Sequence, residues 1–421
     1  MRSCAVYSND TNNKEVSVQQ RSVDAPLTGI KVLEIGVAMA GPFCAMTLGD
    51  YGADVIKIER IDEGDESRTW LSFPFPGGFS SYFASANRNK RSLAIDLKHK
   101  DGLDVVRKLA HETDVLIDNF RPGALESLGL GYEALAAINP RLIYCSISGF
   151  GATGPRAKDR ANDIFMQAYC GLMSITGEEG RGPVKTGTSV ADVAAGMFGT
   201  IGVLLALEAR HKTGRGQRVD TSLLEGQVSM LAQFVTGYFA SGAVPVRRGT
   251  SSQLGATYQA FQAKDDWVVV AAFTERMWQG VCRALNRVDW IKDDRFKSKQ
   301  DRSINRHILI PLLENEFKER SVAEWVALLG EQGVPCSSVN SIDKVVADEQ
   351  VLARDMIVQI DHPTAGQIRM AGLPVKLSEN PGAIRRHPPR LGEHSTQILL
   401  EAGFSSPQID DLLKKGVIGK A

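Results

Sequence analysis

Short apolar runs alternate with amphipathic segments through the first half of the chain. Residues 30–60 contain the run KVLEI, a turn with two glycines, a segment that begins near Pro42, and a second run, DVIKIE. The stretches RSLAIDL, LDVVRKLAHETD, VLIDNF and RLIYCSISGF continue the alternation. Uninterrupted apolar runs separated by amphipathic helices are typical of parallel strands that are covered on both faces. We therefore predict an α/β fold with a Rossmann-like large domain built on a parallel sheet.

The pattern changes toward the C-terminus. Residues 1–26 have no continuous apolar segment and predict a flexible tail rather than a secretory signal. Residues 27–222 form the first part of the large domain, and residues 223–248 predict a linker helix. Residues 249–342 mix the strand-like run DWVVVAAF with the helical VAEWVALLGEQG and predict a smaller α+β domain. Residues 343–421 begin as strand, turn and strand, and we expect them to complete the large domain.

Composition excludes several classes of function. Lysine plus arginine and aspartate plus glutamate both number 49, so no net charge favours nucleic acid or a membrane surface as a partner. The cysteines form no C-x-x-C pair and the histidines no H-x-x-x-H pair, so we predict no metal site and no disulfide framework. We expect the cytoplasm, with the mitochondrial matrix as the alternative. Residues 193–207 carry no charge but are fewer than the ~20 needed to span a bilayer, so we expect a buried helix.

Polar side chains follow three of the predicted strands. Arg60 follows the second strand, Lys98 follows the third, and Asn119, Phe120 and Arg121 follow the fourth. Taken singly, each cation is expected to be a solvated surface charge. Because parallel strands end at the same edge of a sheet, the group together could surround a phosphate, with Phe120 against a base or an apolar arm. The pattern G-x-G-x-x-G is absent, which argues against NAD or FAD.

Asp192 precedes the uncharged run. It is the only acid in the stretch GTSVADVAAGMFGTIGVLLAL. One interpretation is a helix cap. The other is a nucleophile that the positive helix end keeps ionised, with Gly196 and Gly199 leaving room for a ligand. Ser189 offers a third interpretation, since GTSVA approximates the G-x-S-x-G elbow of serine hydrolases, although its last glycine is replaced by alanine.

Many motifs together resemble one family. They include VLEIGVAMAGPFCAMTLGDYGADVIKIER, NRNKRSLAIDLK, DNFRPGALESLGLGYEAL, TSVADVAAG, HKTGRGQRVDTSLLEGQ and the C-terminal PPRLGEHSTQILLEAGF. In this order, across residues 27–418, they resemble the family III CoA-transferases, the formyl-CoA and carnitine CoA-transferase group. The resemblance implies a large domain built from both ends of the chain and a small domain between them. It also implies a homodimer of two chains threaded through each other as linked rings.

The resemblance also implies a mechanism. Asp192 matches the family's nucleophile, which forms an aspartyl anhydride and then an aspartyl-CoA thioester. The resemblance implies coenzyme A as a substrate and no tightly bound cofactor. The positions that match the family's CoA contacts are Met39, Ala40, Arg60, Ile95, Leu97, Lys98, Asn119, Phe120 and Arg121.

Several positions depart from the formyl-CoA branch. Met39 replaces a glutamine, Ser127 replaces a CoA-binding arginine, and residues 247–261 replace a poly-glycine loop. The chain looks closer to the branch that moves CoA from succinyl-CoA to dicarboxylates, including the succinate–hydroxymethylglutarate enzyme. We expect arginine and polar groups near residues 247–259 to face the acyl chain.

Two alternatives stay open at this point. The related α-methylacyl-CoA racemases use a histidine–aspartate pair, and this chain has Asn162 and Asp163 at the corresponding place. Asparagine does not exchange a proton at neutral pH, so two-base racemisation would lack one base. A CoA-binding subunit whose partner performs the chemistry is the other alternative, and the intact Asp192 speaks against it.

Overall fold

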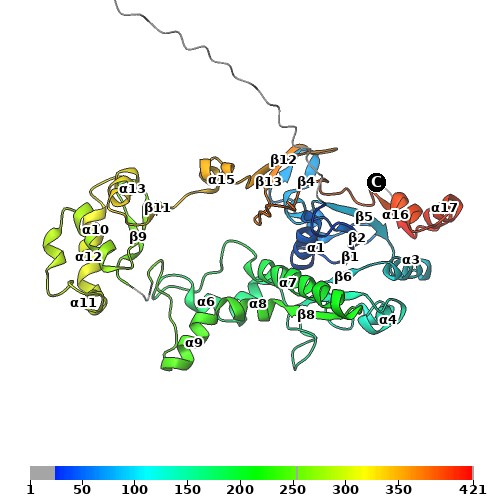
Figure 1. The fold of residues 1–421 in the computed structure, drawn as a ribbon, viewed down its shortest axis with the longest axis horizontal. Helices are drawn as coiled ribbons and strands as arrows, with labels where there is room; N and C mark the ends of the chain where they lie inside the picture. The colour runs from blue at the N-terminus through cyan, green and yellow to red at the C-terminus, as the bar shows by residue number, and fades with distance from the viewer. Residues whose placement is uncertain (1–23, 253–254, 420–421) are drawn as a thin grey trace, which may run out of the picture.

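A seven-stranded sheet forms the centre of the larger part of the molecule (Figure 1). The computed structural model describes residues 24–252 and 255–419; most of the predicted N-terminal tail lies outside them. The strand order is β14-β5-β2-β1-β6-β7-β8, and every pair is parallel except β14 with β5. The strands are β1 (Lys31–Ile35), β2 (Asp54–Glu59), β5 (Lys90–Ile95), β6 (Val115–Asp118), β7 (Ile143–Ser148), β8 (Arg218–Ser222) and β14 (Ile418–Gly419).

The connection order defines where a ligand is expected. In chain order the six parallel strands lie side by side as third, second, first, fourth, fifth and sixth. This is the order of dinucleotide-binding α/β folds, in which the chain changes direction between the first and fourth strands. Ligands bind outside the carboxyl ends of the strands near that point, here between β1 and β6. The predicted α/β class with a large parallel sheet is confirmed.

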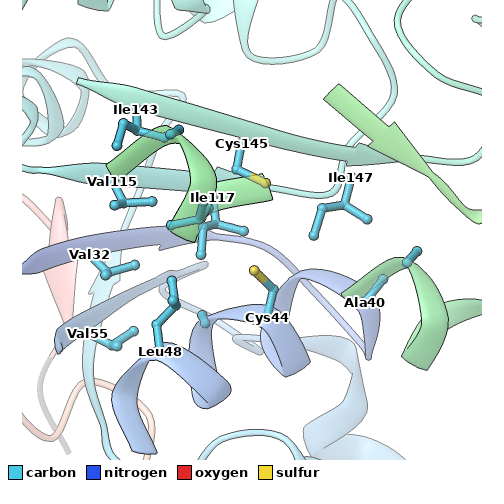
Figure 2. Packing of buried hydrophobic residues seen from close by; sticks show 14 of the residues in the cluster. Val32, Ala40, Cys44, Leu48, Val55, Val115, Ile117, Ile143, Cys145 and Ile147 are labelled. Atoms are coloured by element: carbon cyan, nitrogen blue, oxygen red, sulfur yellow. The ribbon is translucent and has the colours of Figure 1, made fainter. Parts of the chain in front are cut away.

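Helices cover both faces of the sheet because successive strand residues point to opposite sides. Val32 and Val55 pack toward α1 (Ala40–Asp50) and α7 (Val190–Thr213), and Figure 2 shows them close to Leu48 of α1. Leu33 and Leu93 pack on the other face. The helices of that face are α3 (Lys100–His111), α4 (Tyr132–Ile138), α16 (Ser395–Glu401) and α17 (Ser406–Lys414).

The C-terminal segment returns to this sheet. Ile398, Leu412 and Ile418 belong to the same apolar core as the strands, and β14 pairs with β5. Before it, β12 (Ile357–His362) and β13 (Gly366–Ala371) form an antiparallel hairpin, as the strand–turn–strand pattern predicts.

A second apolar core lies between residues 256 and 334. Phe261, Trp278, Phe317 and Trp325 are buried in it. It is built on a three-stranded antiparallel sheet, β9 (Tyr258–Gln262), β10 (Trp267–Ala271) and β11 (Cys336–Ser338). The helices of this core are α10 (Glu275–Ala284), α11 (Lys299–Ile304), α12 (Arg306–Phe317) and α13 (Val322–Glu331).

Short elements connect these bodies and surround the site. On one side α8 (Leu223–Met230) and α9 (Ala232–Ser241) lead to the second core, and residues 242–248 are not helical. On the other side the chain returns through α14 (Ile342–Val345) and α15 (Glu349–Ala353). Near the large sheet lie β3 (Pro74–Phe75), β4 (Phe79–Ser80), α2 (Ser81–Ser85), α5 (Asp163–Tyr169) and α6 (Leu172–Ile175).

Glycines allow α7 to pack closely against its neighbours. A Cβ atom at Gly196 would lie 2.7 Å from the carbonyl oxygen of Ala40, and one at Gly199 would lie 2.6 Å from Cδ1 of Ile147. These two glycines therefore serve packing against α1 and β7. The expectation that they leave room for a ligand is wrong, because protein atoms already occupy that space.

The opposite face of α7 is exposed and apolar. Met197, Phe198, Ile201, Leu204 and Leu205 recur there at helical spacing. By length and composition α7 could cross a membrane, with a mean hydropathy of 1.9. Half of that apolar segment is nevertheless buried in the fold, as in the core helix of a soluble protein. One face of α7 is thus core, as predicted, and the other has no partner within the described residues.

Candidate active site

A cavity of about 620 Å³ lies at the carboxyl ends of β1, β2 and β5. Five of the sequence-predicted CoA contacts line it: Arg60, Ile95, Leu97, Lys98 and Phe120. The structure brings them together because each follows or ends a neighbouring strand of one sheet. Ile95, Leu97 and Phe120 give the cavity an apolar wall. The cations Arg60 and Lys98 also line it.

Acidic residues also line this cavity, but two of them are paired with protein cations. Glu59 accepts from Arg68 at 2.7 Å, and Asp65 lies 2.9 Å from the ammonium of Lys57. Arg60 forms exposed ion pairs with Asp62 and Glu63, and such pairs are weak in water. Lys98 has no ion pair among the described residues. Arg60 and Lys98 are therefore the cations that a phosphate in the cavity can reach.

The loop after β1 forms the next part of the site. Asn119 holds it through two hydrogen bonds with Val37, accepting from the N–H at 2.9 Å and donating to the carbonyl at 2.8 Å. Ala38, which has a left-handed backbone with φ 63°, donates its N–H to Asp65. Asn119 thus supports the loop and does not line the cavity.

Three other predicted contacts stand apart from the cavity wall. Met39 immediately precedes α1, and Ala40 is buried as its first residue. Arg121 is exposed just after β6, and it does not line the cavity.

A buried ion network anchors the strands beneath this loop. Glu34 lies 2.7 Å from Lys57 and 2.7 Å from Lys90, and all three side chains are fully buried. Burial opposes the charge on Lys57, but the carboxylates of Glu34 and Asp65 outweigh it and raise the pKa of Lys57. Burial lowers the pKa of Lys90 to about 8. Lys57 also donates to the carbonyl of Gly36 at 2.9 Å, so the network fixes the start of the loop.

Asp192 lies in the first turn of α7 and is half-buried. Within residues 24–252 and 255–419 its carboxylate has no hydrogen bond and no ion pair. Burial, and then the nearby carboxylate of Asp163, raise the pKa of Asp192 to about 7. The expectation that the helix end keeps this group fully ionised is therefore wrong. Asp163 is held close by, because its Oδ1 accepts from the N–H of Ala191 at 2.8 Å.

Tyr82, on α2, was missed by the sequence argument. Burial raises its pKa, a hydrogen bond with Ser189 opposes that rise, and the charges of Asp192, Asp163 and Asp65 add to it. The phenol of Tyr82 is therefore within electrostatic reach of Asp192 and also of Asp65, which lines the cavity. Its ring lies 4.7 Å from that of Trp70 between centroids. No spacing in the sequence signals this residue, because it comes from a short helix outside the βα alternation.

The structure weakens two of the alternatives. No strand precedes Ser189, so the strand–turn–helix context of a hydrolase elbow is missing. Asn162 caps α5, where its side chain accepts from the N–H of Phe165 at 3.1 Å. It is therefore a structural cap at the place where a racemase needs a base.

The fold and the site together define a class. It is an α/β protein with a cavity at its strand ends, lined in part by Arg60 and Lys98, and a half-buried carboxyl group, Asp192, whose pKa is raised. The sequence model of CoA-transferase family III matches residues 27–395. The chain belongs to this family, it is a CoA-transferase, and CoA thioesters are its substrates. The resemblance read from the motifs is confirmed.

Known relatives agree with this assignment. A succinyl-CoA:glutarate CoA-transferase from Homo sapiens is 38% identical over 394 residues, which cover 93% of this chain and 90% of that protein. A succinate–glutarate CoA-transferase from Agrobacterium fabrum is 34% identical and covers 89% of this chain and 95% of that protein. The crystal structure of a CAIB/BAIF family protein from Brucella suis matches with a TM-score of 0.82 at 37% identity, over 90% of this chain and 100% of that chain.

Proposed function

We propose that the protein moves CoA from succinyl-CoA to a dicarboxylate such as glutarate, with Asp192 as the covalent carrier. The similarity to a succinyl-CoA:glutarate CoA-transferase and to a succinate–glutarate CoA-transferase supports the choice of acids. The observation that carries the mechanism is the state of Asp192. It is a half-buried carboxyl group without a hydrogen-bond partner among the described residues, and burial and Asp163 raise its pKa to about 7.

The proposed reaction begins with the ionised form of Asp192. Its oxygen attacks the thioester carbonyl, the carbon–sulfur bond breaks, and an aspartyl anhydride and CoA thiolate result. The thiolate attacks the aspartyl carbonyl and releases the donor acid, which leaves an aspartyl-CoA thioester. The acceptor carboxylate displaces the thiolate to form a second anhydride. The thiolate then attacks the acceptor's carbonyl, which yields the new acyl-CoA and restores Asp192. Every step exchanges one acyl bond for another, so no net proton or electron is needed.

The cavity supports a place for CoA in this scheme. Arg60 and Lys98 would pair with its phosphates, and Ile95, Leu97 and Phe120 would contact the adenine or the pantetheine arm. Asn119 would act through the loop after β1. Met39 would face the thioester from the start of α1, the buried Ala40 would act by holding that helix start, and Arg121 would reach the ligand from the edge of the sheet.

Two arginines support an acid with a second carboxylate. Arg247 and Arg248 are half-buried, have no ion pair within the described chain, and each has a buried Nε without a hydrogen bond. Their segment packs on the loop that leads to Asp192, where Gly249 donates to the carbonyl of Gly177 at 2.7 Å. Half-buried guanidinium groups without an anion suit a carboxylate ligand.

The exposed apolar face of α7 supports the homodimer, including the linked-ring arrangement implied by the resemblance. Phe239 of α9 and Val244 after that helix are also exposed apolar residues, with exposed fractions of 80% and 73%. An exposed apolar face such as that of α7 is typical of an interface. A second copy of the chain is our proposed occupant, rather than a membrane. The unpaired state of the cysteines in the described residues supports a reducing compartment such as the cytoplasm.

Trapping of the acyl-enzyme tests the function. Wild-type protein is incubated with succinyl-CoA, treated with hydroxylamine and digested for mass spectrometry, and we expect a hydroxamate at Asp192. Asp192→Ala should lower CoA transfer to glutarate on the order of 10⁴-fold or more. Asp159→Ala, which removes an exposed carboxylate paired with Arg156, is the matched control. Full transfer by Asp192→Ala would overturn the proposal. Exchange of the substrate's α-proton with solvent deuterium, without CoA transfer, would indicate a racemase.

A further inference from the structure

Two residues of α5 form hydrogen bonds with the segment immediately before Asp192. Asp163 accepts from the N–H of Ala191 through Oδ1 at 2.8 Å and from the Gln167 amide through Oδ2 at 2.6 Å. Gln167 is fully buried, and its own oxygen accepts from the N–H of Thr186 at 2.9 Å. Asp163 and Gln167 thus hold both ends of the stretch 186–191, and we call this pair the α5 clamp.

The clamp replaces a cap that α7 lacks. The N-cap residue of α7 is Ser189, whose side chain makes no capping hydrogen bond. A helix start leaves several N–H groups without intrahelical partners. Asp163 satisfies the one at Ala191 from a different helix. Because Ala191 directly precedes Asp192, the clamp also fixes the direction in which the Asp192 side chain leaves α7.

The clamp also brings the negative charge of Asp163 close to the carboxylate of Asp192. The charged and titratable groups that act on this place are Asp163 from α5 and the phenol of Tyr82 from α2, with Asp65 beyond Tyr82. The carboxylate of Glu225, in α8, accepts a hydrogen bond from the hydroxyl of Ser222 at 2.5 Å. No cation acts on Asp192 among the described residues. Two carboxylates that share a site repel each other, and the repulsion ends when one becomes a neutral ester.

We propose that Asp163 is a positioning residue for acyl transfer, which orients Asp192 through the α5 clamp and repels its carboxylate so that conversion to the neutral anhydride or thioester is favoured. This inference rests on the proposed covalent role of Asp192. The rate gain would come from a ground state that is held at higher free energy than the acylated state, without any contact between Asp163 and the substrate.

Asp163→Asn tests the repulsion because it removes the charge and keeps an oxygen that can accept from Ala191. We expect the acid limb of the pH profile of kcat/KM, near pH 7 in the wild type, to move down by about one pH unit. We expect kcat above pH 8 to fall about tenfold. Asp163→Glu keeps the charge on a longer side chain, so its acid limb should stay near pH 7 while kcat falls. Asp159→Asn is the control for loss of a nearby exposed carboxylate, and should match the wild type.

A readout independent of catalysis separates this inference from the proposed function. The rate at which a water-soluble carbodiimide modifies Asp192, followed by mass spectrometry, reports its protonated fraction at each pH. A downward shift in Asp163→Asn supports the inference. An unshifted titration and an unshifted acid limb in the folded variant would overturn it, even if hydroxylamine still traps Asp192 in the wild type. If hydroxylamine traps nothing in the wild type, the function fails instead.

Discussion

Asp192→Asn should make the protein more stable at alkaline pH while it abolishes the proposed chemistry. The substitution keeps the size of the side chain and removes its charge. Burial and Asp163 raise the pKa of Asp192 from 3.8 to about 7. In the unfolded chain the group ionises near its ordinary value, so between about pH 4 and pH 7 the folded protein holds a proton that the unfolded chain has lost. Wild-type stability therefore falls as pH rises through this window.

The size of the effect follows from the width of the window. About three pH units at about 1.4 kcal/mol each amount to on the order of 4 kcal/mol above pH 7. Asparagine buries an amide that lacks partners, which costs about 1–2 kcal/mol. We therefore expect a net gain of about 2–3 kcal/mol at pH 8.5 and no gain below pH 4.

Urea unfolding of both proteins at a series of pH values measures this difference. One protein concentration is used throughout, because self-association would add a concentration-dependent term. Asp159→Asn, which breaks only an exposed ion pair, should change the free energy of unfolding by less than about 1 kcal/mol. A free-energy difference for Asp192→Asn that is independent of pH, or a less stable variant at pH 8.5, would refute the reasoning.

Two further predictions concern ligand binding and assembly. Lys98→Gln should raise the KM for acyl-CoA about tenfold and leave kcat nearly unchanged, because Lys98 lines the cavity and has no ion pair within residues 24–252 and 255–419; an unchanged KM, equal to that of the exposed control Lys100→Gln, would remove Lys98 from the binding site. Sedimentation velocity of the wild type should give the mass of two chains at micromolar concentration in both low and high salt, because the proposed contact is apolar; a sedimentation mass of one chain would contradict the proposed dimer.

The sequence was sufficient for the sheet and for one edge of the site. Apolar runs such as VLEI and VLID predict buried parallel strands by themselves. Once the strands are parallel, Arg60, Lys98 and Phe120 must meet at one edge, and they line one cavity. These predictions succeed because strand direction and side-chain alternation are local properties of the backbone.

The surroundings of Asp192 depend on tertiary contacts that no spacing encodes. Asp163 lies in a different helix and reaches Ala191 only after α5 docks against α7. The sequence argument expected the helix end to keep Asp192 ionised and missed the neighbouring charge of Asp163, which together with burial raises the pKa. The fully buried Glu34, Lys57 and Lys90 were hidden for a similar reason, since charged residues inside strands usually face solvent.

The pairing of β14 with β5 has a consequence for synthesis on the ribosome. Ile95, at the end of β5, lines the ligand cavity, while Asp96 donates its N–H to the carbonyl of Val417. Some 320 residues therefore separate Asp96 from Val417 in the chain. The ribosome must synthesise all of them after β5 has left the exit tunnel and before β14 can pair with it. During that interval the edge of β5 has no partner strand, so the nascent chain can mispair there until β14 has been synthesised.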